Sequence, residues 1–373
     1  MRFLLAFTLV LTWANTSLAQ APSPEEAFLD ARERCDSGDQ DGCALLGVHY
    51  ENGRGTEKDL KRAQALFAQS CKAGSAIGCT DRAALMLSET PSEATVQAAS
   101  QLFENACKKG VGRACTSLGY LAVEHAGKLS PKAASARSLR YARMGCRLKN
   151  GWGCFLLGND HLDRRPKKAR ESYRLSCTHG HGPGCILLGQ LLVAGKGGAV
   201  DPKGAAEHFY RACDLGHPKG CGHLARLTQA GLVGTKDLGK AAKLFKIACE
   251  AGDPRSCTDL GMLCIKGKGV PLDYGCAKRR FKSACEGKDG RGCTNLGLMH
   301  HRGLKVRPSA EKAATFYQQG CDLGDARGCG FLGVLYRGDL ASRPESVRRS
   351  LKYLRQACKG GAGFACEALK TGR

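Results

Sequence analysis

The sequence predicts an all-α protein, an αα-superhelical repeat solenoid of helix-turn-helix units stapled by disulfides. Cysteines recur in pairs eight residues apart, apolar residues recur at helical spacing, and Gly-rich turns separate the apolar segments. The 373-residue chain is 43% hydrophobic and 24% charged, as in soluble globular proteins. Length alone would suggest two or three domains, but cysteine pairs that recur mostly every 36 residues indicate a repeat array instead.

Residues 1–21 have the three-part layout of a secretory signal peptide. Arg2 precedes an apolar stretch at 3–14, and small residues stand at Ala19 and Ala21. We expect cleavage after Ala21 or Ala19 and an exported chain, periplasmic or secreted; a buried first helix is the alternative. After residue 25 no apolar run approaches the roughly 18 residues that cross a bilayer, so we expect no transmembrane segment.

Twenty of the 22 cysteines form ten pairs with a spacing of eight residues. The first cysteines of successive pairs are 36, 36, 39, 31, 36, 36, 36, 36 and 37 residues apart. One continuous helix would hold cysteines eight apart at about 12 Å, so the chain must reverse between them for a disulfide to form. In an exported chain these pairs favour disulfides over zinc, whose ligands stand two to four residues apart with His partners. The predicted pairs are Cys35–Cys43, Cys71–Cys79, Cys107–Cys115, Cys146–Cys154, Cys177–Cys185, Cys213–Cys221, Cys249–Cys257, Cys285–Cys293, Cys321–Cys329 and Cys358–Cys366.

The remaining cysteines, Cys264 and Cys276, lie on either side of one Gly-rich turn within a single unit. An oxidising compartment favours an eleventh disulfide, Cys264–Cys276. A reactive thiol pair is the alternative.

Each unit is expected to contain a helix A, a turn and a helix B. Helix A begins at Gly-Cys-x-x-Leu-Gly and carries apolar residues three to four apart, such as Leu46 and Tyr50. An Asp or Ser before Lys-Ala-Ala caps helix B, which ends at the next cysteine. We therefore expect one solenoid over residues 22–373, made of a leading half unit 26–41, units 42–77, 78–113, 114–152, 153–183, 184–219, 220–255, 256–291, 292–327 and 328–364, and a terminal helix 365–370.

The pattern Gly-Cys-x-x-Leu-Gly…Gly-x-Gly…Asp-x-x-Lys-Ala…Phe…Ala-Cys over residues 26–373 resembles Sel-like repeats, relatives of tetratricopeptide repeats. The paired cysteines resemble the Hcp-type (Helicobacter cysteine-rich protein) β-lactamase-like family. The resemblance implies a right-handed superhelix with a concave face lined mainly by A helices. It also implies adaptor-like binding of proteins or peptides and, for Hcp-type members, penicillin binding with weak β-lactamase activity.

A serine β-lactamase needs Ser-x-x-Lys at the start of a helix, and the chain has one such match, Ser309 to Lys312. Aligning the units places Ser309 where others have Asp59, Asp237 or Asp273, so we interpret Ser309 as a helix cap. The catalytic residues stay unassigned, and β-lactam hydrolysis remains an alternative that depends on the resemblance. No cofactor or metal is expected, because the histidines are more simply explained as packed or solvated side chains.

Charge is unevenly distributed along the chain, whose formal net charge is +23. Residues 22–104 carry 14 acidic and 8 basic residues, whereas residues 105–373 carry 20 acidic and 48 basic residues, most densely at 132–174. The surplus indicates either a solvated basic face or a surface that attracts anions, such as a cell-wall or anionic envelope component. No sequence motif indicates binding to nucleic acid.

Positions two and five residues after each second cysteine vary between units, and helical spacing places them on related faces of successive A helices. We select the polar residues at these positions as candidates for facing a ligand, although they could simply face water. They are Asp81, Asn159, Gln190, His223, Arg226, Asp259 and Asn295. The preferred function is an exported repeat scaffold that binds proteins, peptides or cell-wall components on its concave face. A weak β-lactamase and a basic envelope-binding or effector protein are the alternatives.

Overall fold

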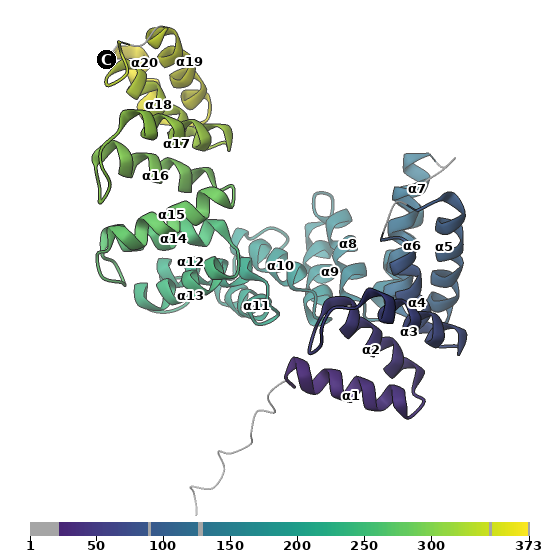
Figure 1. The fold of residues 1–373 in the computed structure, drawn as a ribbon. Helices are drawn as coiled ribbons and strands as arrows, with labels where there is room; N and C mark the ends of the chain where they lie inside the picture. The colour runs from purple at the N-terminus through teal and green to yellow at the C-terminus, as the bar shows by residue number, and fades with distance from the viewer. Residues whose placement is uncertain (1–21, 89–90, 126–129, 343–344, 372–373) are drawn as a thin grey trace, which may run out of the picture. The chain divides into compact units, whose positions relative to one another are not determined.

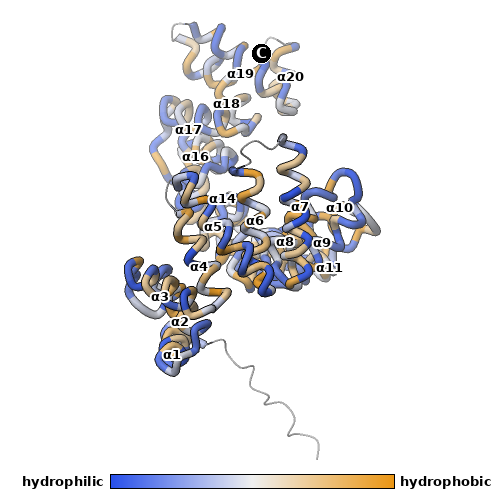
Figure 2. The backbone as a smooth tube through the Cα atoms, turned by 90° about the vertical axis from the view of Figure 1, so that its right-hand side faces the viewer, coloured by the Kyte–Doolittle hydropathy of each residue, from blue (hydrophilic) through white to orange (hydrophobic). Residues whose placement is uncertain are grey.

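The computed structural model describes residues 22–88, 91–125, 130–342 and 345–371 (Figure 1). These residues form twenty α-helices and no strand, which confirms the all-α repeat class. Hydrophobic positions recur in the helices along the whole tube of Figure 2, as expected when each repeat buries its own share of the core. None of the helices in these ranges is long and apolar enough to cross a membrane. The expected signal peptide lies outside the described residues.

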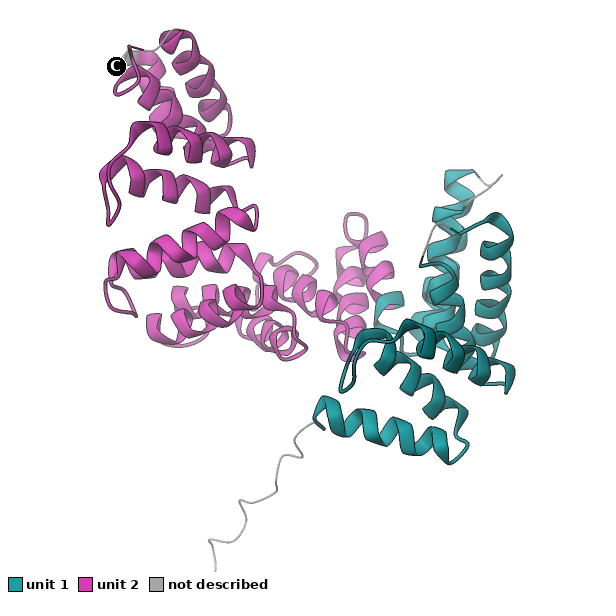
Figure 3. Cartoon of the chain, viewed as in Figure 1, with its two compact units in different colours: residues 1–153 teal, residues 154–373 magenta. Residues whose placement is uncertain are grey.

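The chain separates into two compact units, residues 1–153 and 154–373, with the boundary inside one helix (Figure 3). The first unit contains α1 (Pro24–Asp36), α2 (Gln40–Asn52), α3 (Leu60–Lys72), α4 (Ala76–Met86), α5 (Glu93–Lys108), α6 (Gly112–Glu124), α7 (Pro131–Arg147) and the start of α8 (Gly151–His161). The second contains the rest of α8 and α9 (Pro166–Thr178), α10 (Gly182–Ala194), α11 (Pro202–Asp214), α12 (Pro218–Ala230), α13 (Leu238–Glu250), α14 (Pro254–Lys266), α15 (Tyr274–Glu286), α16 (Gly290–Arg302), α17 (Ala310–Asp322), α18 (Ala326–Arg337), α19 (Ser346–Lys359) and α20 (Gly363–Thr371). The terminal helix thus begins two residues before the expected 365.

Even-numbered helices are the A helices and odd-numbered helices are the B helices of the expected hairpins. In the second unit the successive A helices α10, α12, α14, α16 and α18 contact one another, and each B helix packs mainly against the A helices on either side. The A helices are therefore the more closely spaced layer and line the concave side of this unit.

The predicted disulfides join the end of each B helix to the start of the next A helix. Nine of the ten pairs with a spacing of eight are bonded as predicted, with Cα–Cα distances from 4.3 to 4.8 Å. Cys264 and Cys276 are also bonded to each other, and the two remaining cysteines, Cys146 and Cys154, are both disulfide-bonded. The chain reverses through a short turn in which Gly252, for example, has a φ of +91°.

In five of the hairpins (α2/α3, α8/α9, α10/α11, α14/α15 and α16/α17) a glycine of helix A faces an aromatic ring of helix B. The ring stands four residues before the first cysteine of a pair, and it is almost fully buried at Phe67, Tyr173, Phe209, Phe281 and Tyr317. At Gly261 an added Cβ would lie 2.6 Å from Cε1 of Phe281, closer than atoms pack. The glycine of the Leu-Gly pair is therefore a packing requirement of these five hairpins.

We predict that Gly261→Ala destabilises the protein by about 1–3 kcal/mol, because overpacking outweighs the better helix propensity of alanine. Gly239→Ala is the matched control, since its Cβ would meet no atom closer than 3.5 Å. Denaturant unfolding of the oxidised chain measures both. Equal stability of the two variants would contradict the packing argument.

Candidate functional site

Three positions of the A helices, numbered from the second cysteine of each pair, recur at equivalent places along the repeats. Position −2 lies in the first helical turn, and positions +2 and +5 are those selected from the sequence. In the second unit, position −2 is basic in four consecutive A helices: Lys219, Arg255, Arg291 and Arg327. This column was not selected from the sequence, although its recurrence at intervals of 36 residues was visible there.

The structure pairs the residues selected from the sequence with one another across neighbouring repeats. Gln190 Nε2 lies 3.0 Å from His223 Nε2, and Arg226 donates to Asp259 over 3.1 Å. In each pair, position +5 of one A helix meets position +2 of the next. These four side chains therefore form lateral contacts along the A-helix face.

The other three selected residues have different surroundings. Asp81 is 5% exposed and forms an ion pair with Arg113 of the next A helix. Asn159 accepts a hydrogen bond from the Tyr173 hydroxyl over 2.7 Å, and Asn295 is 7% exposed. Asp81 and Asn295 therefore expose little surface to a ligand. Asn159 links helix A to helix B of its own hairpin.

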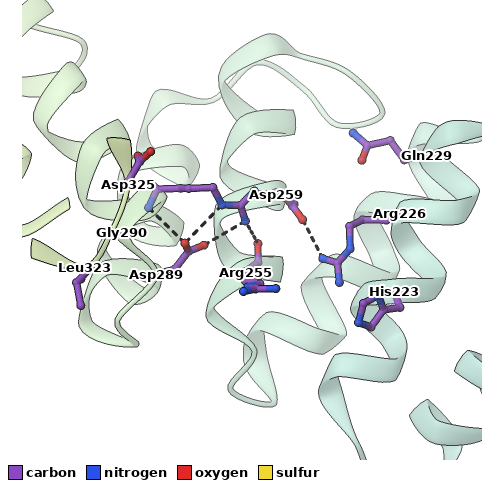
Figure 4. A pocket seen from close by; sticks show the side chains of 11 residues that line it. His223, Arg226, Gln229, Arg255, Asp259, Asp289, Gly290, Leu323 and Asp325 are labelled. Carbon is purple, nitrogen blue, oxygen red and sulfur yellow. Dashed lines mark hydrogen bonds and ion pairs between the residues drawn. The ribbon is translucent and has the colours of Figure 1, made fainter. Parts of the chain in front are cut away.

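A groove of ≈ 550 Å³ runs along the A-helix face from α12 to the turn before α18 (Figure 4). It brings together three of the selected residues, His223, Arg226 and Asp259. Figure 4 shows Arg226 directed at Asp259, with Asp289 across the groove from them. The remaining lining residues are Gln229, Arg255, Asp289, Gly290, Arg291, Leu323, Gly324 and Asp325.

Most charges in this groove are paired between repeats. Arg291 contacts Asp259 of the preceding A helix at 3.4 Å and Asp289, the cap of its own helix, at 3.2 Å. Asp289 also accepts a hydrogen bond from the Thr258 hydroxyl over 2.8 Å. These bonds hold the first turns of α14 and α16 in a fixed relation.

Arg255 differs from the two arginines that follow it in this column, Arg291 and Arg327, because both of those contact aspartates. Its side chain is exposed, and no carboxylate of the described residues lies within ion-pair distance of its guanidinium group. The residue at position +2 of the preceding A helix is His223, where Arg291 has Asp259. Burial, reinforced by the Arg226 charge, lowers the pKa of His223 to about 4, so this imidazole is neutral near pH 7. Arg255 therefore offers an unneutralised cation to the groove.

The Sel1 repeat matches six segments of the chain, and they cover more than half of it: residues 40–75, 182–217, 218–253, 254–289, 290–325 and 326–361.

The chain belongs to the Sel1 repeat family.

Two solved structures show the same fold at low sequence identity. A protective antigen present in uropathogenic Escherichia coli strains, with an SLR fold, is 21% identical with a TM-score of 0.66, over 92% of this chain and 75% of that one. A Sel1 repeat protein from Oxalobacter formigenes is 20% identical with a TM-score of 0.57, over 84% of this chain and 94% of that one. No curated protein matches the sequence.

The Hcp-type assignment within the Sel1 repeat family stays an expectation. Helicobacter pylori cysteine rich protein B is 27% identical, but the similarity spans 35% of this chain and 98% of that one, at a TM-score of 0.30. That similarity is too limited to decide the subfamily. The dense disulfides do indicate an exported Sel1 repeat protein, because such bonds persist in oxidising compartments.

Ser309 occupies the cap position expected from the alignment of the Sel1 repeats. Its hydroxyl accepts a hydrogen bond from the Lys312 backbone N–H over 3.2 Å, as Asp237 accepts one from Lys240. The same hydroxyl donates to Glu311 over 3.2 Å. These contacts confirm the interpretation of Ser309 as the cap of α17.

We predict that Ser309→Ala lowers the free energy of unfolding by about 1 kcal/mol through loss of the cap. Any nitrocefin hydrolysis by the oxidised chain is expected to be the same in both forms. Asp237→Ala, at the equivalent cap of α13, is the control for stability. Loss of hydrolysis in the Ser309 variant alone would overturn the capping interpretation.

A second prediction concerns pH. His223 titrates at about 4 when folded and near 6.5 when unfolded, so the unfolded chain takes up its proton first as the pH falls. The stability due to neutral His223 is complete above pH 6.5 and is lost between pH 6.5 and 4. Thermal melting across this range should show a smaller loss for His223→Asn than for the wild type. A variant of the exposed His125 serves as the control. If His223→Asn loses as much stability between pH 6.5 and 4 as this control does, His223 is not the source of the pH dependence.

Proposed function

We propose that this protein is an exported scaffold that binds a protein segment carrying an acidic side chain in the groove between α12 and α18. The proposal rests on Arg255, an exposed cation with no carboxylate partner among the described residues. The residues at the same position of the following Sel1 repeats do contact carboxylates. Sel1 repeats typically mediate contacts between proteins, and a solenoid offers an extended rigid surface for them.

The paired residues give this groove a fixed shape before a partner arrives. Arg226, Asp259, Arg291 and Asp289 are linked by contacts between 3.1 and 3.4 Å. Side chains that are already ordered lose little conformational entropy when a partner binds. Arg255 and Gln229 then supply donors for carboxylate and backbone oxygens, because a guanidinium group binds a carboxylate in a bidentate manner.

The experiment is a selection from a random 12-residue peptide library on the oxidised chain that begins at Pro22. We expect the recovered peptides to be enriched in Asp and Glu. Arg255→Ala should weaken a selected peptide about tenfold or more, as loss of a hydrogen bond to a charged group does. Fluorescence polarisation measures this affinity.

The matched control is Lys246→Ala, which removes another exposed cation, this one from the B helix α13. This variant should bind the selected peptides as the wild type does. If both variants weaken binding equally, the attraction comes from the general positive charge, and the groove proposal fails. Absence of acidic enrichment would contradict it as well.

A further inference from the structure

The first unit has a second groove on its A-helix face, with different chemistry. It encloses ≈ 440 Å³ between α4, α6 and the start of α8. Its apolar lining comes from Leu87, Phe103, Leu121, Tyr120 and Trp152, and its polar lining from Arg113, Thr116, Ser117 and Asn150. Tyr120 and Trp152 are 57% and 43% exposed, so two large aromatic side chains border this groove at the surface.

Comparing equivalent repeat positions shows how the two grooves differ. Position −2 of α8 is Trp152 where α16 has Arg291, and position +2 of α6 is Ser117 where α14 has Asp259. An ion pair of the second unit is thus replaced by an aromatic ring and a hydroxyl. Exposed Tyr, Trp and Arg together are the composition that dominates binding energy at protein interfaces.

Arg113 shows which charge this groove fits. It stands at position −2 of α6, and it forms an ion pair with Asp81 at position +2 of the preceding A helix, as Arg291 does with Asp259. Arg291 also contacts the cap residue Asp289, but the cap of α6 is Val111, which has no acidic group. Among the described residues Arg113 therefore has one carboxylate partner where Arg291 has two, and its side chain is 51% exposed.

The other polar groups of the groove can also donate. Asn150 Oδ1 accepts hydrogen bonds from the Thr116 hydroxyl and the Gly153 N–H, at 2.9 and 3.1 Å, so its NH₂ group is left to donate. The Ser117 hydroxyl lines the same space. An apolar wall bordered by a guanidinium, an amide and a hydroxyl matches a group that is both apolar and negatively charged.

We propose that this groove binds the C-terminal residue of a partner protein, with an aromatic side chain on the apolar wall and its carboxylate on Arg113. A C-terminal residue carries both groups on one Cα. In an extended segment, by contrast, adjacent aromatic and acidic side chains point to opposite faces. The groove is separate from the one that carries the proposed function, so either site can fail without the other.

The experiment uses Trp152, which is the only tryptophan after Pro22. The oxidised chain is titrated with acetyl-Gly-Gly-Phe as the free acid, as the C-terminal amide, and with acetyl-Phe-Asp-amide. We expect saturable change in Trp152 emission with the free acid and at least tenfold weaker binding of both amides. The proposal fails if the free acid and the amide of acetyl-Gly-Gly-Phe bind equally well. It also fails if acetyl-Phe-Asp-amide binds as well as the free acid.

Variants test the role of Arg113 without leaving a buried charge unpaired. The double variant Asp81→Asn/Arg113→Gln removes both members of the ion pair and should abolish the preference for the free acid. Tyr120→Ala, at the exposed border, should weaken the free acid and the amide together. Arg82→Gln removes an exposed cation of α4 and should change neither. Retention of the preference in the double variant would contradict the assignment of Arg113.

Discussion

The disulfide between the end of each B helix and the start of the next A helix is the constraint on which the rest of the structure depends. It fixes where each A helix begins relative to the preceding hairpin, with cysteine Cα atoms 4.3–4.8 Å apart. A solenoid has no central core, so repeats are held by contacts with their neighbours alone. With the start of every A helix fixed, equivalent residues stand in columns along the A-helix face.

These columns allow one scaffold to carry different chemistries. At the same positions, the second unit places Arg291 between two aspartates, and the first unit places Trp152 beside Arg113 and Ser117. The glycine-to-ring packing beneath this face recurs in five hairpins, where helix A and helix B leave no room for a larger side chain. Substitutions in the exposed columns therefore change the partner chemistry without changing the hairpins.

Much of this architecture could be predicted from the sequence, because cysteine spacing and helix caps are local signals. The pairing of Cys249 with Cys257 and the cap at Ser309 are examples. The sites were harder to predict, because the residues that meet on the A-helix face are 32 or 33 positions apart in the sequence. Gln190 and His223 were selected as separate ligand-facing residues, but the stacking of α10 on α12 brings them together. Arg255 was missed because only a neighbouring repeat shows that its charge lacks a partner.

The two proposed grooves both place the binding partner on the A-helix face. The most direct measurement is photo-crosslinking in the cells that make the protein, with a benzophenone amino acid at Gln229 or Tyr120 on A helices and at Lys246 on a B helix. We expect discrete adducts from one or both A-helix positions and none from Lys246. Adducts from Lys246 alone would contradict it.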